Sequence, residues 1–382
     1  MALEVMGSTP TTHPIEKPLL RQGLFHVIPH DGDPFADAAT IRHAPDARRT
    51  KGEAMDSLLF ALEAIAPIIL TVAIGYGIKR AGWLTADMAG VINKLVFRLF
   101  LPAMLFLNVY KIESLGALEF DYILYAAAAI VLIFGLSIPA VMAVTPSGAR
   151  RGALLQACFR SNYALIGIPL AASLFGQEGV SVATLLSAAT IPLFNILAVV
   201  SLSLFGKGEA RPSVRRILLG IVKNPLIQSI FLGILVLCLR GVLLRYGLSF
   251  RLTDIGPVYT VLGYLSGLAT PLALLMLGVQ FEFSAVSGLR KEILFGALVR
   301  VFAVPLLGIG AAYLFFRDTF GGAEFAAFVA LFATPVAVSS VPMAQEMGAD
   351  HTLAGQLVVW TTLLSAASVF VASFLLRLAG IF

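Results

Sequence analysis

Apolar runs of roughly 20 residues alternate with short polar segments from residue 58 to the C-terminus. A run of this length, as an α-helix, crosses a hydrocarbon core of about 30 Å. The runs cover approximately residues 58–78, 91–110, 121–144, 153–175, 180–205, 217–239, 257–280, 293–316, 325–345 and 353–379. Because lipid cannot satisfy the backbone of an open sheet edge, the pattern predicts an all-α integral membrane protein with ten transmembrane helices.

The second half of the chain repeats helix-breaking positions of the first half in the same order. Residues 67–75 are echoed by 225–233, Pro102 by Pro271, and residues 162–169 by 335–342, at offsets of 158, 169 and 173 residues. Two halves with an odd number of helices each must have opposite orientations. The repeat therefore predicts two inverted five-helix repeats, an arrangement typical of secondary transporters.

Composition and charge support the membrane assignment. Hydrophobic residues make up 58% of the chain and charged residues 13%, against about 25% charged in soluble domains. Twelve Lys and Arg fall in loops on one side of the ten expected crossings and six on the other. The positive-inside rule places the richer side in the cytoplasm, with both ends of the ten-helix unit outside. The net charge of +5 therefore indicates orientation in the cytoplasmic (inner or plasma) membrane, not nucleic-acid binding.

The chain divides into four parts. Residues 1–54 have low hydrophobicity, four of the five histidines and no long apolar run, which predicts a disordered tail. The segment from Met55 resembles a natural start, so we expect that translation can begin there. The first five-helix repeat is expected in 55–206, a cytoplasmic linker in 207–224 and the second repeat in 225–382. The tail histidines are too widely spaced for a metal site, so no metal or cofactor is expected.

Two prolines in matching positions predict broken helices. Gly167 precedes Pro169 in the fourth apolar run, and Ser339 and Ser340 precede Pro342 in the ninth. A proline inside a helix releases backbone carbonyls, and in lipid these groups need other partners. Unwinding near the midplane would leave half-helices whose N-terminal ends suit an anion. The alternative is a simple proline kink without a ligand.

A few polar residues lie deep in the apolar runs. We expect these and the break residues to bind substrate: Arg160, Asn162, Gly167, Pro169, Asn195, Arg300, Ser339, Ser340 and Pro342, with Asn108 as a weaker candidate. An intramembrane arginine predicts an anionic substrate or a carboxylate partner, although buried asparagines also join membrane helices. No nucleophile–base set is visible, so an enzyme is not expected. Sodium or proton coupling stays open.

Several motifs resemble the auxin efflux carrier family, whose bacterial members include malate and malonate permeases. They are Ser161-Asn-Tyr-Ala-Leu-Ile-Gly-Ile-Pro-Leu, Val338-Ser-Ser-Val-Pro-Met-Ala-Gln-Glu, Phe97-Arg-Leu-Phe-Leu-Pro and Arg300-Val-Phe-Ala-Val-Pro. The resemblance covers residues 58–382. It implies ten helices with broken, crossing helices four and nine, similar to bile-acid sodium symporters, and a carboxylate substrate. Pro335-Val-Ala-Val is less polar than in the plant carriers, which argues against auxin itself.

The sequence thus favours a permease that moves a small organic anion by alternating access. A channel or passive receptor on the same fold is the alternative, because broken helices also line channels. The partners expected are the anion, the lipid bilayer and, as an option, a second copy of the chain.

Overall fold

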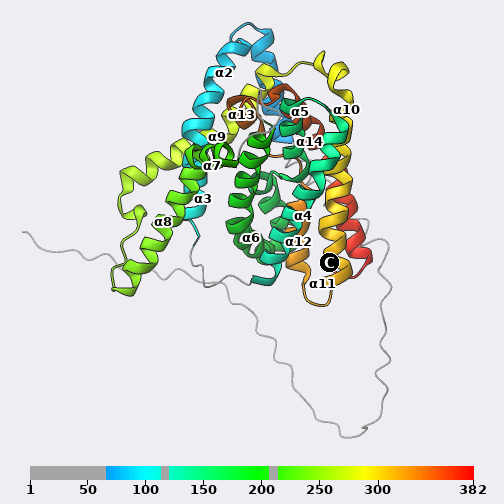
Figure 1. The fold of residues 1–382 in the computed structure, drawn as a ribbon. Helices are drawn as coiled ribbons and strands as arrows, with labels where there is room; N and C mark the ends of the chain where they lie inside the picture. The colour runs from blue at the N-terminus through cyan, green and yellow to red at the C-terminus, as the bar shows by residue number, and fades with distance from the viewer. Residues whose placement is uncertain (1–65, 113–119, 206–213) are drawn as a thin grey trace, which may run out of the picture. The chain divides into compact units, whose positions relative to one another are not determined.

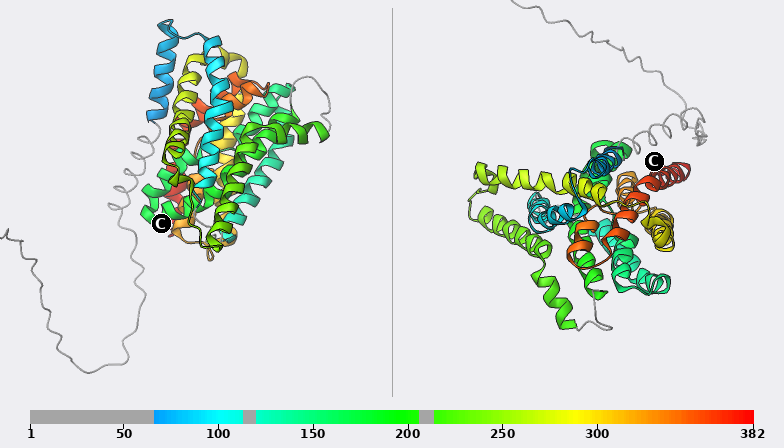
Figure 2. Two further views of the ribbon diagram at one scale, coloured as in Figure 1. Left: turned by 90° about the vertical axis from the view of Figure 1, so that its left-hand side faces the viewer. Right: turned by 90° about the horizontal axis from the view of Figure 1, so that it is seen from above.

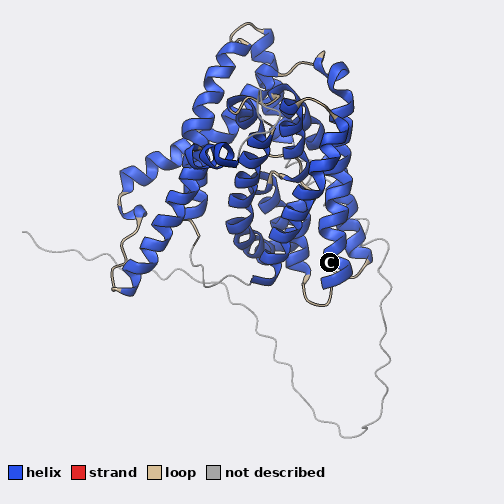
Figure 3. Ribbon diagram, viewed as in Figure 1, coloured by secondary structure: helices blue, strands red, loops and turns tan. Residues whose placement is uncertain are grey.

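The computed structural model describes residues 66–112, 120–205 and 214–382. All of them belong to one compact unit, 47–382. Every regular element in these ranges is a helix (Figure 3). The expected tail 1–54 and the part 207–213 of the expected linker 207–224 lie outside the described residues, so the domain boundaries stay predictions.

Seven described helices are long and apolar enough to cross a membrane, which confirms the all-helical membrane class. They are Ala86–Tyr110, Phe120–Val144 (α4), Tyr163–Leu204, Pro225–Arg245 (α8), Gly256–Gln280 (α9), Ala285–Phe316 and His351–Leu378 (α14). The first comprises α2 (Ala86–Leu95), the π-helical turn η1 (Val96–Phe100) and α3 (Leu101–Tyr110). The sixth comprises α10 (Ala285–Leu298), the π-helical turns η5 (Val299–Ala303) and η6 (Leu306–Gly310), and α11 (Ala311–Phe316).

The longest of these spans is bent. Tyr163–Leu204 contains the π-helical turn η3 (Tyr163–Gly167) and α6 (Ile168–Leu204), and α6 has non-helical backbone at Phe175 and Gly176. Gly176 has a φ of 56°, a conformation that glycine adopts without steric cost. The chain therefore reverses direction near Gly176, and α6 is two helices in sequence.

The remaining apolar runs appear as shorter pieces. Residues 66–80 form one helix. Helix α5 (Gly148–Phe159) ends before residues 160–162, which separate it from η3, and α12 (Gly322–Phe332) is separated from α13 (Ser340–Glu346) by residues 333–339. Short elements complete the fold: α7 (Val214–Lys223) precedes α8, and the 3₁₀ turn η4 (Leu252–Asp254) precedes α9.

Both interruptions exist, but the expected break at Gly167 and Pro169 is wrong. Residues 160–162 are non-helical, whereas Pro169 lies inside the span that begins at Tyr163, just after the π-helical turn η3. Pro169 has no N–H to donate to a preceding carbonyl, yet the helix continues through it. Pro342 lies in the first turn of α13, after the break. A proline in a first turn sacrifices no intrahelical hydrogen bond, because the first N–H groups of a helix have no partner within it.

The described helices form two sets, seen best from above in Figure 2. One set contains α2, α3, α8 and α9, and α3 packs mainly on α8 and α9. The other contains α4, α5, α6 and α10 to α14, with α12 against α6 and α13 against α14 (Figure 1). Every residue of α12 from Phe325 to Phe332 is buried, so this half of the broken helix forms the middle of the second set.

The helix 66–80 joins the first set through a close glycine contact. A Cβ at Gly278 of α9 would lie 2.0 Å from the carbonyl oxygen of Val72, and one at Gly75 would lie 2.1 Å from that of Leu275. Only glycine fits at either position without moving a backbone, so the two helices cross almost in backbone contact.

Candidate functional site

The two interrupted helices meet at their breaks through backbone hydrogen bonds. Ser161 and Val336 form an antiparallel bridge. The Asn162 N–H donates to the Pro335 carbonyl at 2.8 Å, and the Ala337 N–H donates to the Arg160 carbonyl at 3.4 Å. Peptide groups released from one helix are therefore satisfied by those released from the other, as a low-polarity surrounding requires.

Arg300 holds the carbonyl ends of both half-helices. It is 1% exposed. Its Nε donates to the Thr334 carbonyl at 2.8 Å and its Nη1 to the Phe159 carbonyl, the last of α5, at 3.3 Å. Its Nη2 donates to the carbonyls of Leu331 and Phe332, at the end of α12, at 3.1 and 3.4 Å. Because helix C-termini carry partial negative charge, this guanidinium neutralises two of them at once.

Arg160, in the first break, is held by neutral side chains. It is 3% exposed. Its Nη1 donates to Gln156 Oε1 at 3.0 Å and to Met343 Sδ, and its Nη2 donates to Asn195 Oδ1 and Ser339 Oγ, both at 2.8 Å. Within the described part of the chain, no carboxylate lies within ion-pair distance of this guanidinium. A buried cation with only neutral dipoles around it is a favourable place for an anion.

A cavity of about 70 Å³ lies beside Arg160, between the crossing and the helices α3, α6 and α9. Its other walls are mostly apolar, among them Leu101, Met104 and Phe194. Two buried polar atoms next to it, Ser161 Oγ and Asn162 Nδ2, have no hydrogen-bond partner among the residues that the structure describes. Polar side chains lining the cavity are Asn108, Arg160, Ser161, Asn162, Asn195, Thr270 and Ser339.

The structure brings together four of the nine predicted site residues and places the other five elsewhere. Arg160, Asn162, Asn195 and Ser339 all line the cavity. Those outside its lining are Gly167, Pro169, Ser340, Pro342 and Arg300.

Each of the five outside the cavity has a structural explanation or another position. A Cβ at Gly167 would lie 2.8 Å from the Ala330 carbonyl, so this glycine allows close packing of η3 on α12. Pro169 is exposed and Pro342 is buried within α13. Ser340 is 1% exposed, and its Oγ has no partner among the described residues.

Sequence reasoning missed Ser161 and Thr270. Ser161 directly precedes Asn162 in the quoted motif and was the easier to find. Thr270 comes from α9, in the other helix set, and directly precedes Pro271. Only the folded arrangement brings it to the cavity.

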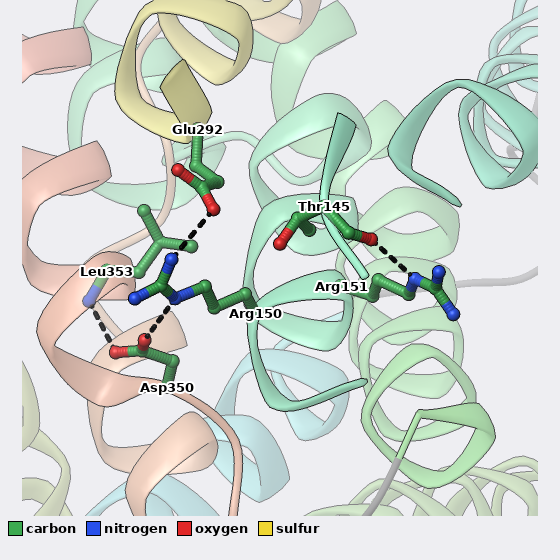
Figure 4. Close-up of polar contacts among 6 residues, drawn as sticks. All are labelled: Thr145, Arg150, Arg151, Glu292, Asp350 and Leu353. Carbon is green, nitrogen blue, oxygen red and sulfur yellow. Dashed lines mark hydrogen bonds and ion pairs between the residues drawn. The ribbon is translucent and has the colours of Figure 1, made fainter. Parts of the chain in front are cut away.

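Charges at the far end of the same helix set are paired, in contrast to Arg160. Arg150 at the start of α5 lies 3.0 Å from Glu292 of α10 and 3.5 Å from Asp350, which caps α14 (Figure 4). Arg151 donates to the Thr145 carbonyl at 2.7 Å. This network ties the starts of α5 and α14 to the middle of α10, on the side expected to face the cytoplasm.

Polar contacts also connect the two helix sets on that side. Asn93 of α2 is fully buried, and its Nδ2 donates to Gln280 Oε1 at 2.9 Å and Gln345 Oε1 at 2.8 Å. The Nε atom of Arg98 lies 3.4 Å from Oε2 of Glu346. The contacts to Gln345 and Glu346 join α13 of the second set to α2 and η1 of the first, beyond the crossing.

Comparison with known proteins decides the family. The model of the family described as "Membrane transport protein" matches residues 60–373, which is most of the chain. The chain belongs to this family. The family includes the auxin efflux carriers that the motifs resemble, so that recognition is confirmed.

Two archaeal relatives are also called transporters. An uncharacterized transporter of Methanothermobacter thermautotrophicus is 26% identical over 317 residues, covering 80% of this chain and 95% of the relative. An uncharacterized transporter of Methanocaldococcus jannaschii is 24% identical over 248 residues, covering 64% of this chain and 75% of the relative. Family and relatives together establish a multi-pass membrane transport protein, and they favour a transporter over an enzyme.

Proposed function

We propose that this protein is a secondary transporter that moves a small organic anion, a carboxylate, across the cytoplasmic membrane by alternating access. The observation that carries the proposal is the buried guanidinium of Arg160 beside a cavity, with no carboxylate among the described residues to neutralise it. Burying an uncompensated charge costs several kcal/mol per ion. A bound anion would recover part of that cost.

Other groups at the crossing also favour a ligand with a negative charge. Asn162 Nδ2 is a donor without an acceptor in the described part of the chain, and Ser161 Oγ can donate as well as accept. The helix that begins at Tyr163 directs its positive end toward the crossing, since its first residue lines the cavity. A carboxylate accepts from such donors with both oxygens.

The two helix sets supply the parts that alternating access requires. In the proposal, the ten apolar runs form ten crossings in two inverted repeats, and the set with the crossing moves against the set with α2, α3, α8 and α9. The cavity draws its lining from both sets. Bonds from Asn93 to Gln345 and from Arg98 to Glu346 would then hold the cytoplasmic side closed and break when that side opens.

Coupling and assembly are further parts of the proposal. Among the described residues that line the cavity there is no carboxylate or imidazole, so proton coupling would need a titrating group elsewhere. Sodium would need only carbonyl, hydroxyl and amide oxygens, which the crossing offers. A homodimer in the inner membrane stays a prediction, which light scattering of the purified protein would test.

The decisive experiment is counterflow in proteoliposomes. Liposomes loaded with an unlabelled mono- or dicarboxylate should accumulate the labelled compound transiently, in a saturable way, with and without sodium or a pH gradient. Arg160→Ala and Asn162→Ala should each lower accumulation at least tenfold, because each removes a group that contacts the anion. Ser181→Ala, at an exposed position of α6, is the matched control and should transport normally.

Two outcomes would overturn the proposal. Flux that rises linearly with concentration and shows no counterflow would indicate a channel. Normal counterflow in both site variants would mean that the anion binds elsewhere.

A further inference from the structure

We infer that the cavity beside Arg160 takes a small anion with one carboxylate and an uncharged remainder, and that it discriminates against dicarboxylates. The inference rests on the proposed function, because it specifies the ligand of the same cavity. Three properties of the cavity carry it: the number of cations in its lining, the different character of its two ends, and its volume.

The cavity offers charge compensation for one carboxylate. Arg160 is the single cationic side chain among the described residues that line it. Arg300, the other buried arginine at the crossing, lies outside the lining and donates to backbone carbonyls of α5 and α12. One bound carboxylate therefore makes the site electrically neutral. A second carboxylate would be buried without a cation, and an unpaired charge in a low-polarity site is strongly disfavoured.

The end of the cavity at the crossing suits the carboxylate. Arg160 Nη2 donates to Asn195 Oδ1 and Ser339 Oγ, both at 2.8 Å, and both of these residues line the cavity. A carboxylate is a stronger acceptor than an amide or hydroxyl oxygen, so it would replace them on the guanidinium. It would also accept from Asn162 Nδ2, which has no acceptor among the described residues.

The walls away from the crossing suit an uncharged group. Helices α3, α6 and α9 supply apolar side chains there, among them Leu101, Met104, Leu105 and Phe194, and two neutral polar ones, Asn108 and Thr270. The hydroxyl of Thr270 donates to Met104 Sδ at 4.0 Å. These walls can contact a methyl group or hydrogen-bond a hydroxyl, oxo or amide group. They carry no charge to neutralise a second carboxylate.

The volume of the cavity limits the length of the anion. Space for one water-sized sphere amounts to roughly 10–15 Å³. The cavity encloses about 70 Å³, so it holds roughly five to seven atoms other than hydrogen. Propionate and pyruvate have this size, whereas malate and citrate are larger. Volume and charge therefore point to the same class of ligand, a short monocarboxylate.

Malonate and its monoamide, malonamate, separate charge from size. The two have the same number of non-hydrogen atoms and differ by one negative charge at mildly alkaline pH. Purified protein is titrated with each compound, and with propionate and pyruvate, and the apparent Kd is obtained from the shift of the thermal unfolding midpoint. The wild type should bind malonamate at least tenfold more tightly than malonate. Arg160→Met should abolish the binding of every monocarboxylate.

A second cation in the cavity should change the preference. Asn108→Lys adds one to the wall away from the crossing and should raise the affinity for malonate at least tenfold. Ser181→Lys adds the same charge at an exposed position of α6. This control should keep the wild-type preference for malonamate.

The outcomes separate this inference from the proposed function. Malonate that binds the wild type as tightly as malonamate does, and no longer binds Arg160→Met, would overturn the inference and leave the proposed function standing. Unchanged malonate affinity in folded Asn108→Lys would also overturn the inference. If none of the four compounds binds, or if binding survives in Arg160→Met, the proposed site fails and the inference fails with it. The wild-type comparison needs no substitution, so it decides the question even where Asn108→Lys does not fold.

Discussion

Replacing Arg300 with methionine should destabilise the fold, because the side chain fastens the ends of two half-helices. Arg300→Met removes four hydrogen bonds to the carbonyls of Phe159, Leu331, Phe332 and Thr334. Hydrogen bonds between membrane helices average about 0.6 kcal/mol, which sets a lower estimate of about 2.4 kcal/mol for four. A buried carbonyl left without a partner costs about 1–3 kcal/mol. We expect the free energy of unfolding to fall by about 2–5 kcal/mol.

The same substitution at Arg160 should behave differently. Its partners are side chains of Gln156, Asn195, Ser339 and Met343, which can turn toward one another, and the variant no longer buries an uncompensated charge. Arg160→Met should therefore stay within about 1 kcal/mol of the wild type, or exceed it, while transport is lost. Both arginines are almost fully buried, so a comparison of their methionine variants separates an effect on stability from an effect on substrate binding.

Unfolding by SDS titration in mixed micelles, with counterflow measured on the same preparations, distinguishes the two roles. Arg300→Lys keeps the charge but offers three donors from one nitrogen instead of a planar fork, so its stability should lie between wild type and Arg300→Met. Wild-type stability in Arg300→Met combined with lost transport would refute the reasoning. It would return Arg300 to the substrate-binding role expected from the sequence.

Three other predictions follow from the packing and the contacts between helix sets. Gly278→Val should lower the free energy of unfolding by about 1–3 kcal/mol, because its Cβ would meet the Val72 carbonyl. Gly263→Val on the same helix is the control, since a Cβ there meets nothing within 4 Å. Equal SDS unfolding midpoints for the two variants would contradict the close crossing. Gln345→Leu removes an acceptor of Asn93, so the cytoplasmic side should open more often. In an Ala337→Cys background, the rate of labelling by maleimide added from the cytoplasmic side should then rise roughly three- to tenfold. An unchanged rate would show that the bond between Asn93 and Gln345 does not hold the cytoplasmic side closed. Deleting residues 1–54 should leave membrane insertion and counterflow unchanged, and a loss of insertion would show that the tail is needed.

Apolar patterning predicted much of the fold. The expected run 257–280 is α9 within one residue, and 121–144 is α4 within one residue at its start. Hydrophobic length alone defines such segments, because the membrane fixes how many residues cross it. The interruption at 160–162 was misplaced, since a proline can lie inside a continuing helix or at a helix start as well as at a break, and the sequence alone does not separate these positions.

The candidate site was predicted only in part, because the sequence does not show what surrounds each residue in the fold. Arg160 and Arg300 looked alike in sequence, as deep cations in apolar runs, and they have opposite surroundings in the fold. Arg300 faces carbonyls of α5 and α12, which no spacing rule connects, whereas Arg160 faces a cavity. Thr270 could not be found because its distance from Arg160 depends on how the two helix sets pack.

The antiparallel bridge between Ser161 and Val336 has an evolutionary consequence. Main-chain atoms make this junction, and every amino acid other than proline offers the same main-chain donor. Side chains around it can therefore be exchanged for others without dismantling the junction. Substitutions at these side-chain positions could change the substrate preference while the fold stays the same.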